Sequence, residues 1–178
     1  GLQAFLPDTG ALLWEQSWPT AQFSRCIQPM VFDTDRILLG ATGNAASKFF
    51  QITRQENTWA VEELWFAKKF RPYFNDAVSY QGYVYGFDGE RLVCLDLKNG
   101  EQRWAGPRCG GQLLLFAEKG FLLVITEKGV LKLVPASPDS YQEAFTLSVL
   151  SGKTWNHPVV ARGKIYLRNA TEAVCLAL

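Results

Sequence analysis

Histidines and reactive cysteine arrangements are almost absent from this sequence. His157 is its one histidine, and its four cysteines form neither a CxxC spacing nor a vicinal pair. One histidine excludes a histidine-rich metal site and leaves no spare histidine for a Ser-His-Asp triad. The cysteines do not have the spacing of a zinc site. We therefore assign no catalytic residue and no metal ligand from the sequence.

The sequence also lacks an excess of charge of one sign and lacks long hydrophobic runs. The 18 basic and 17 acidic residues leave a net charge of +1, without a basic stripe. A nucleic-acid-binding protein would carry such a stripe. The longest apolar runs, 112–117 and 121–126, have the length of strands, far below the roughly 20 residues that span a bilayer. We expect no nucleic-acid partner and no membrane span.

The first residues contain neither a methionine nor a basic segment, since the chain opens Gly-Leu-Gln-Ala-Phe. A secretory signal peptide would begin with a basic region followed by an apolar one. We expect no signal peptide in this sequence, and its opening is typical of a trimmed or internal segment. This absence does not argue for a cytoplasmic location.

The cysteines fall into two kinds. Cys94 and Cys175 occupy matching Val-Cys-Leu contexts, which predicts small buried core residues on different repeats rather than a disulfide. Cys26 and Cys109 lie in connecting segments, where either free thiols or a pair is possible. The redox compartment stays open.

Aromatic residues, at 13% of the chain, are plentiful, and they favour an all-β fold because they pack well on pleated sheets. Residues 82–97 and 163–178 repeat one pattern: a glycine turn, an alternating strand, a polar turn and a second strand. Residues 120–133 are a third copy, and 35–52 a degenerate one. The glycine-bearing segment 40–47 within it lacks the Gly-Lys-Ser/Thr of a phosphate loop, and we interpret it as a strand connection.

A second unit recurs as a turn followed by a tryptophan. Gly10 and Gly100 stand in the turns, where glycine tolerates a positive φ, and Trp14 and Trp104 follow. Trp65 and Phe145 hold the same place in two further copies, which sets spacings of 51, 39 and 41 residues. Blades of a β-propeller recur about every 40–50 residues. These aromatic side chains are predicted to pack onto the neighbouring sheet.

The predicted fold is an all-β propeller of four-stranded antiparallel blades, with about four blades' worth of chain. We expect 1–17 to end one blade, 18–67, 68–106 and 107–149 to form whole blades, and 150–178 to form a last blade without its outer strand. The expected first strands are 28–32, 75–80, 111–117 and 156–162. A solenoid of β-hairpins is the alternative, but four strands per repeat with a docking tryptophan favour radial packing.

The strands do not add up to a closed four-bladed ring. Strands at 2–6 and 11–17 open the chain, and 2–6 would compete with 173–178 for one position. Because open sheet edges promote aggregation, we expect the native ring to be larger than this chain alone can form. Either residues precede Gly1 or two copies form a homo-oligomeric ring.

The motifs at 8–14 and 96–104 resemble the tryptophan-docking motif of the PQQ-like (quinoprotein-type) propeller family, and 82–85 and 163–166 resemble its second strand. The chain is similar to the C-terminal half of an uncharacterised bacterial member, and this resemblance implies a ring of seven or eight blades. That resemblance implies a periplasmic or secreted location. PQQ and calcium are implied by it alone, and the Cys-Cys pair of the family's dehydrogenases is absent. The family also includes the lipoprotein of the outer-membrane β-barrel assembly machinery.

Two connecting segments supply the candidate binding residues. Residues 65–76 mix cations and aromatics, as binding surfaces do, although such aromatics also seal neighbouring blades together. Residues 155–157 lie at the entry to a first strand, where propellers point residues at the central funnel. The candidates are Lys69, Arg71, Tyr73, Asn75, Asp76, Trp155, Asn156 and His157. Asn169 opens a glycosylation sequon, relevant only in a eukaryotic secretory pathway.

Function is predicted from these surfaces, because a propeller fold does not define one. The first hypothesis is a non-catalytic scaffold with a protein partner. A PQQ-dependent oxidoreductase whose active site lies in other blades is the second, and a carbohydrate-binding module the third.

Overall fold

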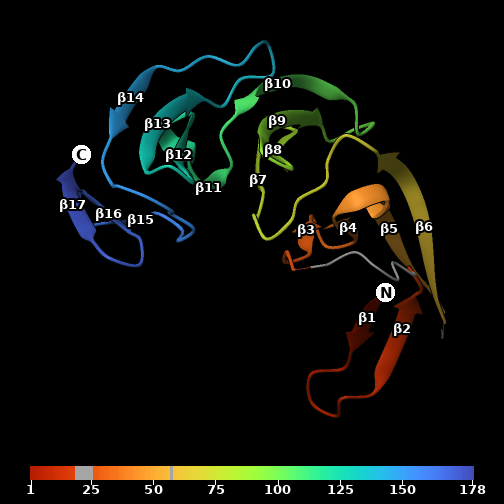
Figure 1. The fold of residues 1–178 in the computed structure, drawn as a ribbon. Coiled ribbons are helices and arrows are strands. Elements are labelled where there is room, and N and C mark those ends of the chain that lie inside the picture. Colours follow the sequence, from red (N-terminus) through yellow and green to blue (C-terminus); the bar gives the residue numbers. More distant parts are fainter. Residues whose placement is uncertain (19–25, 57) are drawn as a thin grey trace.

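The computed structural model describes residues 1–18, 26–56 and 58–178, and this part of the chain is all-β (Figure 1). Its strands form one two-stranded, three four-stranded and one three-stranded sheet. In chain order the sheets are β1 (Leu2–Phe5) and β2 (Leu12–Gln16); β3 (Met30–Phe32), β4 (Arg36–Gly40), β5 (Ser47–Gln55) and β6 (Thr58–Ala67); β7 (Val78–Tyr80), β8 (Tyr83–Asp88), β9 (Arg91–Asp96) and β10 (Gln102–Arg108); β11 (Gly111–Phe116), β12 (Phe121–Thr126), β13 (Val130–Pro135) and β14 (Phe145–Ser148); β15 (Val159–Ala161), β16 (Lys164–Arg168) and β17 (Ala173–Ala177).

Each sheet is an antiparallel meander in which neighbours in sequence are neighbours in space. The five sheets follow one another along an arc, with the first strand of each larger sheet on the concave side and the last on the convex side (Figure 1). The predicted class, an all-β propeller built from four-stranded antiparallel blades, is confirmed. The only helical elements among the described residues are two 3-10 turns, η1 (Gly43–Ala45) and η2 (Ala117–Lys119). No helix in these ranges is long and apolar enough to cross a membrane.

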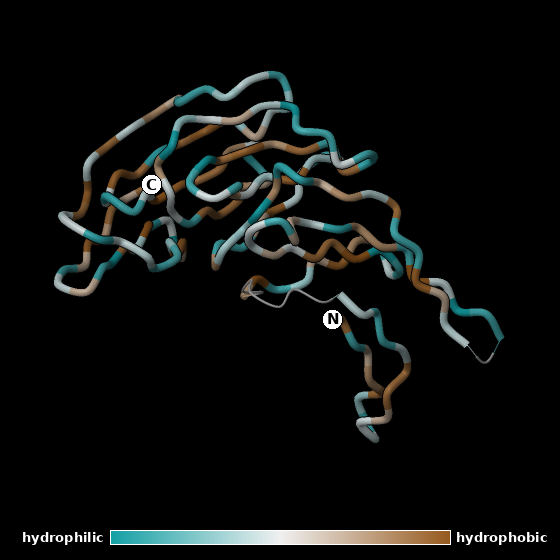
Figure 2. The backbone as a smooth tube through the Cα atoms, turned by 45° about the vertical axis from the view of Figure 1, so that its right-hand side comes forward, coloured by the Kyte–Doolittle hydropathy of each residue, from teal (hydrophilic) through white to brown (hydrophobic). Residues whose placement is uncertain are grey.

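The strands are apolar and their turns polar, as the hydropathy of the chain shows (Figure 2). Because central strands are covered on both faces, β8 and β9 are each buried at four consecutive positions and β12 at five. The core is divided between the sheets rather than gathered in one place. Tyr85 and Trp104 pack with Leu122 of the next sheet, and Leu123 packs in the same way with Ile165. Each sheet is therefore stabilised by the next.

Trp65 and Trp104 cross from the outer strand of one sheet to the next one. Trp65 Nε1 donates to the carbonyl oxygen of Leu97 at 2.9 Å, and Trp104 Nε1 donates to that of Ser137 at 2.7 Å. Both acceptors follow the third strand of the neighbouring sheet. The indole also removes apolar area from water, so each tryptophan combines a hydrogen bond with burial.

Phe145 and Trp14 occupy positions in their outer strands that are equivalent to that of Trp104. Trp104 pairs with Cys94, Phe145 with Leu133 and Trp14 with Ala4, each near the end of a third strand. Trp14 is half-buried against the β3–β6 sheet. Phe145 is 46% exposed.

The first strands are shorter than expected: β3, β7 and β15 have three residues each. Asn75 and His157 belong to the connections that precede strands, not to strands. Asn75 turns its side chain toward Gly111 instead. At residue 158 a proline without an amide hydrogen cannot donate to a ladder.

All four cysteines are free. Cys94 is buried as predicted, but the same prediction for Cys175 is wrong, since Cys175 is exposed. Cys94 faces the β11–β14 sheet, whereas no sheet of the described chain packs on the corresponding face of β17. Burial raises the pKa of the Cys94 thiol to about 12, so it stays protonated.

Candidate binding face

One face of the arc carries both the connections between sheets and the turns between second and third strands. We call it the rim face and define it by its loops, which are 41–46, 68–77, 88–91, 109–110, 126–130, 149–158 and 168–173. Antiparallel meanders place these loops at the same end of every sheet. Loops set on a rigid sheet are where binding residues concentrate.

The loops of the rim face are joined to one another by backbone hydrogen bonds. Cys109 N and Gly110 N both donate to Glu90 O at 2.9 Å, Glu127 N donates to Gly110 O at 3.3 Å, and Thr154 N donates to Glu127 O at 2.9 Å. Connection and turn thus alternate along three sheets. The side chains on this face stand on a backbone that is fixed by its own hydrogen bonds.

The connection 68–77 alternates between anchoring and displayed side chains. Phe70 is fully buried, and it lies so close to Gly86 that a Cβ there would meet its ring at 2.8 Å. Its carbonyl accepts a hydrogen bond from Ser47 Oγ at 2.8 Å. Arg71 and Tyr73, on either side of the buried Pro72 in the sequence, are exposed. Buried residues of this connection therefore pack the neighbouring sheets together, and the exposed residues between them are available for binding.

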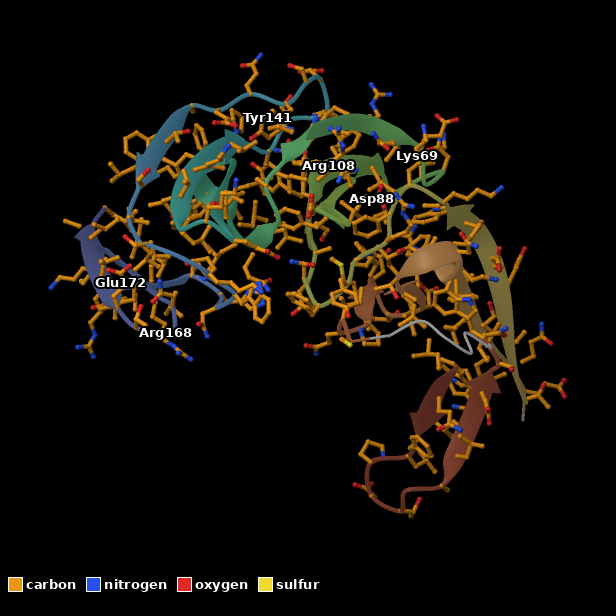
Figure 3. The ribbon with its side chains drawn as sticks, in the orientation of Figure 1. Lys69, Asp88, Arg108, Tyr141, Arg168 and Glu172 are labelled. Atoms are coloured by element: carbon orange, nitrogen blue, oxygen red, sulfur yellow. The ribbon has the colours of Figure 1, made fainter. Side chains whose placement is uncertain are left out.

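Arg71 and Asp88 form a bidentate ion pair across this connection. Arg71 Nε lies 2.6 Å from Asp88 Oδ1 and Nη2 lies 2.8 Å from Oδ2, and the Arg71 amide also donates to Oδ1 at 3.0 Å. The hydrogen bonds to Asp88 raise the pKa of Arg71 further above its ordinary value. The pair fixes the loop against the β8–β9 turn, and Asp88 and Arg108 lie on this part of the arc with Lys69 nearby (Figure 3).

Two adjoining hollows, of 660 and 560 Å³, open on the rim face. They share Glu90, Arg108 and Glu127 in their walls. The first is bounded further by Thr42, Gly43, Arg71, Tyr73, Phe74, Asn75, Asp88, Gly89, Arg91 and Trp155, and the second by Cys109, Gly110, Lys128, Gly152 and Lys153. Each hollow falls within the size range of ligand sites, which is about 300–1,000 Å³.

An aromatic cluster borders the first hollow. The rings of Tyr73 and Phe74 lie 4.9 Å apart, and Phe74 meets Trp155 edge-on at 5.8 Å. Tyr73 and Trp155 are each 50% exposed. Lys153 Nζ lies 3.9 Å from the centroid of Trp155, within cation–π distance. This cluster brings together residues from two connections that lie about 80 residues apart in the sequence.

Some of the predicted binding residues line the first hollow, and others hold the loops of the rim face in place. Arg71, Tyr73, Asn75 and Trp155 line the first hollow. Asn75 and Asp76 serve the structure, because Asn75 Nδ2 donates to Gly111 O and Asp76 Oδ1 accepts from Gln28 N at 3.1 Å. Lys69, Asn156 and His157 belong to the same connections without lining either hollow.

Sequence reasoning missed the charged residues that complete the hollows, chiefly Arg108, Lys128, Lys153 and Glu127. Each lies in a rim loop or, for Arg108, at the end of an outer strand. Their common signal is position, since they precede or follow strands at the same end of successive repeats. Their individual contexts carry no motif.

The carboxylates of the rim face do not fit a calcium site of the kind that the PQQ-like resemblance implies. Asp88 is held by Arg71, and Glu90 lies 3.3 Å from Arg108. Among the described residues no group of three or more histidine, cysteine or acidic side chains is placed to hold a metal ion. Burial raises the pKa of the Cys109 thiol, which disfavours its nucleophilic form. The face offers aromatic, cationic and hydrogen-bonding contacts.

Comparison with known proteins supports the fold. No known family model and no curated protein matches the chain. BamB from Moraxella catarrhalis superposes on 94% of it at 12% identity with a TM-score of 0.52. AztD from Citrobacter koseri superposes on 98% at 15% identity with a TM-score of 0.58. The chain is thus similar to β-propeller structures. It spans 63% and 52% of their respective lengths.

Proposed function

We propose that this chain is a non-catalytic propeller domain that binds a protein partner on its rim face. The observation that carries the proposal is the cluster of half-exposed Tyr73 and Trp155 beside Arg108 and Lys153, on hydrogen-bonded loops. Tyrosine, tryptophan and arginine are the residue types that dominate protein interfaces. A rigid backbone beneath them lowers the entropy lost on binding.

The finer identity of the domain is part of the same proposal. The tryptophan-docking motifs favour the PQQ-like family, and with it a periplasmic or secreted location. The native ring has seven or eight blades, of which this chain supplies about four. The free edge of β17, which pairs only with β16 among the described residues, supports a larger assembly.

Site-specific photo-cross-linking tests the binding role. A photoreactive amino acid is placed at Tyr73 on the rim face or at Leu64, which is exposed on the convex strand β6. We expect a discrete protein adduct from position 73, identified by mass spectrometry and reproduced with the purified partner. The adduct should weaken with Trp155→Ala. Equal adducts from both positions, or none from position 73, would contradict a partner on the rim face.

A further inference from the structure

The two hollows of the rim face carry more positive than negative charge. Their walls hold the cations Arg71, Arg91, Arg108, Lys128 and Lys153 and the carboxylates Asp88, Glu90 and Glu127. This local excess of two positive charges exceeds the net charge of the whole chain, which is +1. A ligand that bears negative charge is therefore favoured here.

The carboxylates of the hollows are already engaged to different degrees. Asp88 is neutralised by the bidentate pair with Arg71, and Glu90 is shared with Arg108. Within the described residues, neither Lys128 nor Lys153 has a carboxylate at ion-pair distance. Arg91 also has no carboxylate at that distance among the described residues, but its Nη1 donates to the Gly106 carbonyl at 2.8 Å. The two lysines are therefore the cations left for a partner.

Lys153 also lies against the ring of Trp155. Its ammonium lies 3.9 Å from the indole centroid and Phe74 meets the ring edge-on at 5.8 Å, while 50% of Trp155 stays exposed. A carboxylate that pairs with Lys153 arrives next to the indole, where an apolar side chain gains burial. Lys153 lines the second hollow and Trp155 the first, so this pair joins them.

Glu90 and Glu127 argue against a densely charged polyanion. Both lie in the wall shared by the two hollows. A sulfated glycan or a nucleic acid places negative charge along its whole length and would be repelled there. A polypeptide can alternate its carboxylates with apolar side chains.

We propose that the rim face recognises an acidic protein segment in which a carboxylate stands beside an apolar or aromatic residue. The carboxylate binds at Lys153 and Lys128, and the apolar residue packs on Trp155 and Tyr73. This inference rests on the binding function proposed above and specifies the chemistry of the partner.

Fluorescence anisotropy of the purified chain tests the proposal with labelled polymers. The probe is a random copolymer of glutamate and tyrosine, compared with polyglutamate, a lysine–tyrosine copolymer and heparin. We expect the glutamate–tyrosine copolymer to bind most tightly, and added salt to weaken its binding, because the ion pairs on this face are solvent-exposed. Tighter binding of heparin or of the lysine–tyrosine copolymer, or no binding of the glutamate–tyrosine copolymer, would overturn the proposal.

Variants locate the binding. Trp155→Ala should weaken binding of the glutamate–tyrosine copolymer by about tenfold or more, as loss of an interface tryptophan does, and Trp155→Phe should restore part of it. Lys153→Gln should weaken binding of this copolymer and reduce its salt dependence. Tyr166→Ala and Lys164→Ala, on exposed positions of β16, are the matched controls and should leave binding unchanged. Equal losses in the controls would contradict the assignment to the rim face.

The two experiments separate the two proposals. A partner cross-linked at Tyr73 in a chain that ignores the glutamate–tyrosine copolymer would refute the acidic segment and leave the binding function standing. Absence of a cross-linked partner would refute the binding function whatever the copolymer does.

Discussion

The indole of Trp65 lies directly over Gly100 of the neighbouring sheet. A Cβ on Gly100 would stand 2.6 Å from Trp65 Cε3, and Trp65 Nε1 donates to the adjacent Leu97 carbonyl. Gly100 also has a φ of +72°, in the left-handed region. One glycine therefore satisfies two demands, the turn that follows β9 and the docking of a side chain from another sheet.

Gly100→Ala is expected to lower the free energy of unfolding by about 2–4 kcal/mol, since it adds overpacking to backbone strain. Gly10→Ala is the matched control. Gly10 has a similar φ of +69°, but nothing lies within 4 Å of a Cβ there, so we expect about 1 kcal/mol. Urea denaturation followed by tryptophan fluorescence measures both. Equal losses would show that the contact with Trp65 contributes nothing.

Trp104→Ala should destabilise the chain by about 3–5 kcal/mol, because it opens a cavity and leaves the Ser137 carbonyl without its donor. Phe145→Ala, at the equivalent register but with a side chain 46% exposed, should cost less than about 1 kcal/mol. Thermal and urea unfolding compare the two. A large loss at Phe145 would mean that its side chain is covered in solution, as in a closed ring.

Asn169→Ala is expected to cost about 1–3 kcal/mol. Asn169 Nδ2 donates to Ser151 O at 2.7 Å, while its Oδ1 accepts from the backbone amides of Thr171 and Glu172 at 2.9 Å. Asn44→Ala, at an exposed position, is the control and should stay within about 0.5 kcal/mol. Because the Asn169 amide is used in folding, the sequon should remain unglycosylated in a eukaryotic secretory host, which intact mass measures.

The hydrogen bonds of the Glu143 carboxylate are expected to make a contribution to stability that is lost in acid. Lys132 and Tyr141 both bind its Oε1 at 2.6 Å. These hydrogen bonds, that with Lys132 first, hold the pKa of Glu143 below its ordinary 4.5. A lowered folded pKa gives stability that is present above pH 4.5 and is lost as the pH falls through the folded value.

Glu143→Gln should therefore lower the free energy of unfolding at pH 7 by about 1–2 kcal/mol. The difference from the unsubstituted chain should shrink as the pH falls below 4.5. Urea titrations between pH 3 and pH 7 measure it, with Glu118→Gln on the exposed turn η2 as control. A difference that stays constant with pH would show that the charge of Glu143 is not involved.

The copied hairpins made the fold predictable, because each repeat carries its own strand alternation and turn residues. The turns at Gly82 and Gly163 therefore lie where expected, before β8 and β16. Contacts between repeats were not predictable to the same degree. Asn75 was expected in a strand, yet its bond to Gly111 spans 36 residues, and local sequence does not encode such a partner.

The candidate site was predictable only where composition was unusual. The aromatic and basic segment 65–76 gave Arg71 and Tyr73, and Trp155 stood out by size. Arg108 and Lys153 have ordinary neighbours, and they join the site because the loops of successive sheets meet on one face. That meeting depends on the number and angle of the sheets, which no single repeat specifies.

The hydrogen bonds that join Glu90, Gly110, Glu127 and Thr154 are made by main-chain atoms alone. Their geometry does not depend on which side chains project from those loops. Residues such as Lys153 and Arg108 can be exchanged without releasing the loops that hold them, so the selectivity of this surface can be rewritten independently of its shape. The rim face is therefore suited to library selection of new binders, because its side chains can be varied while its backbone stays the same.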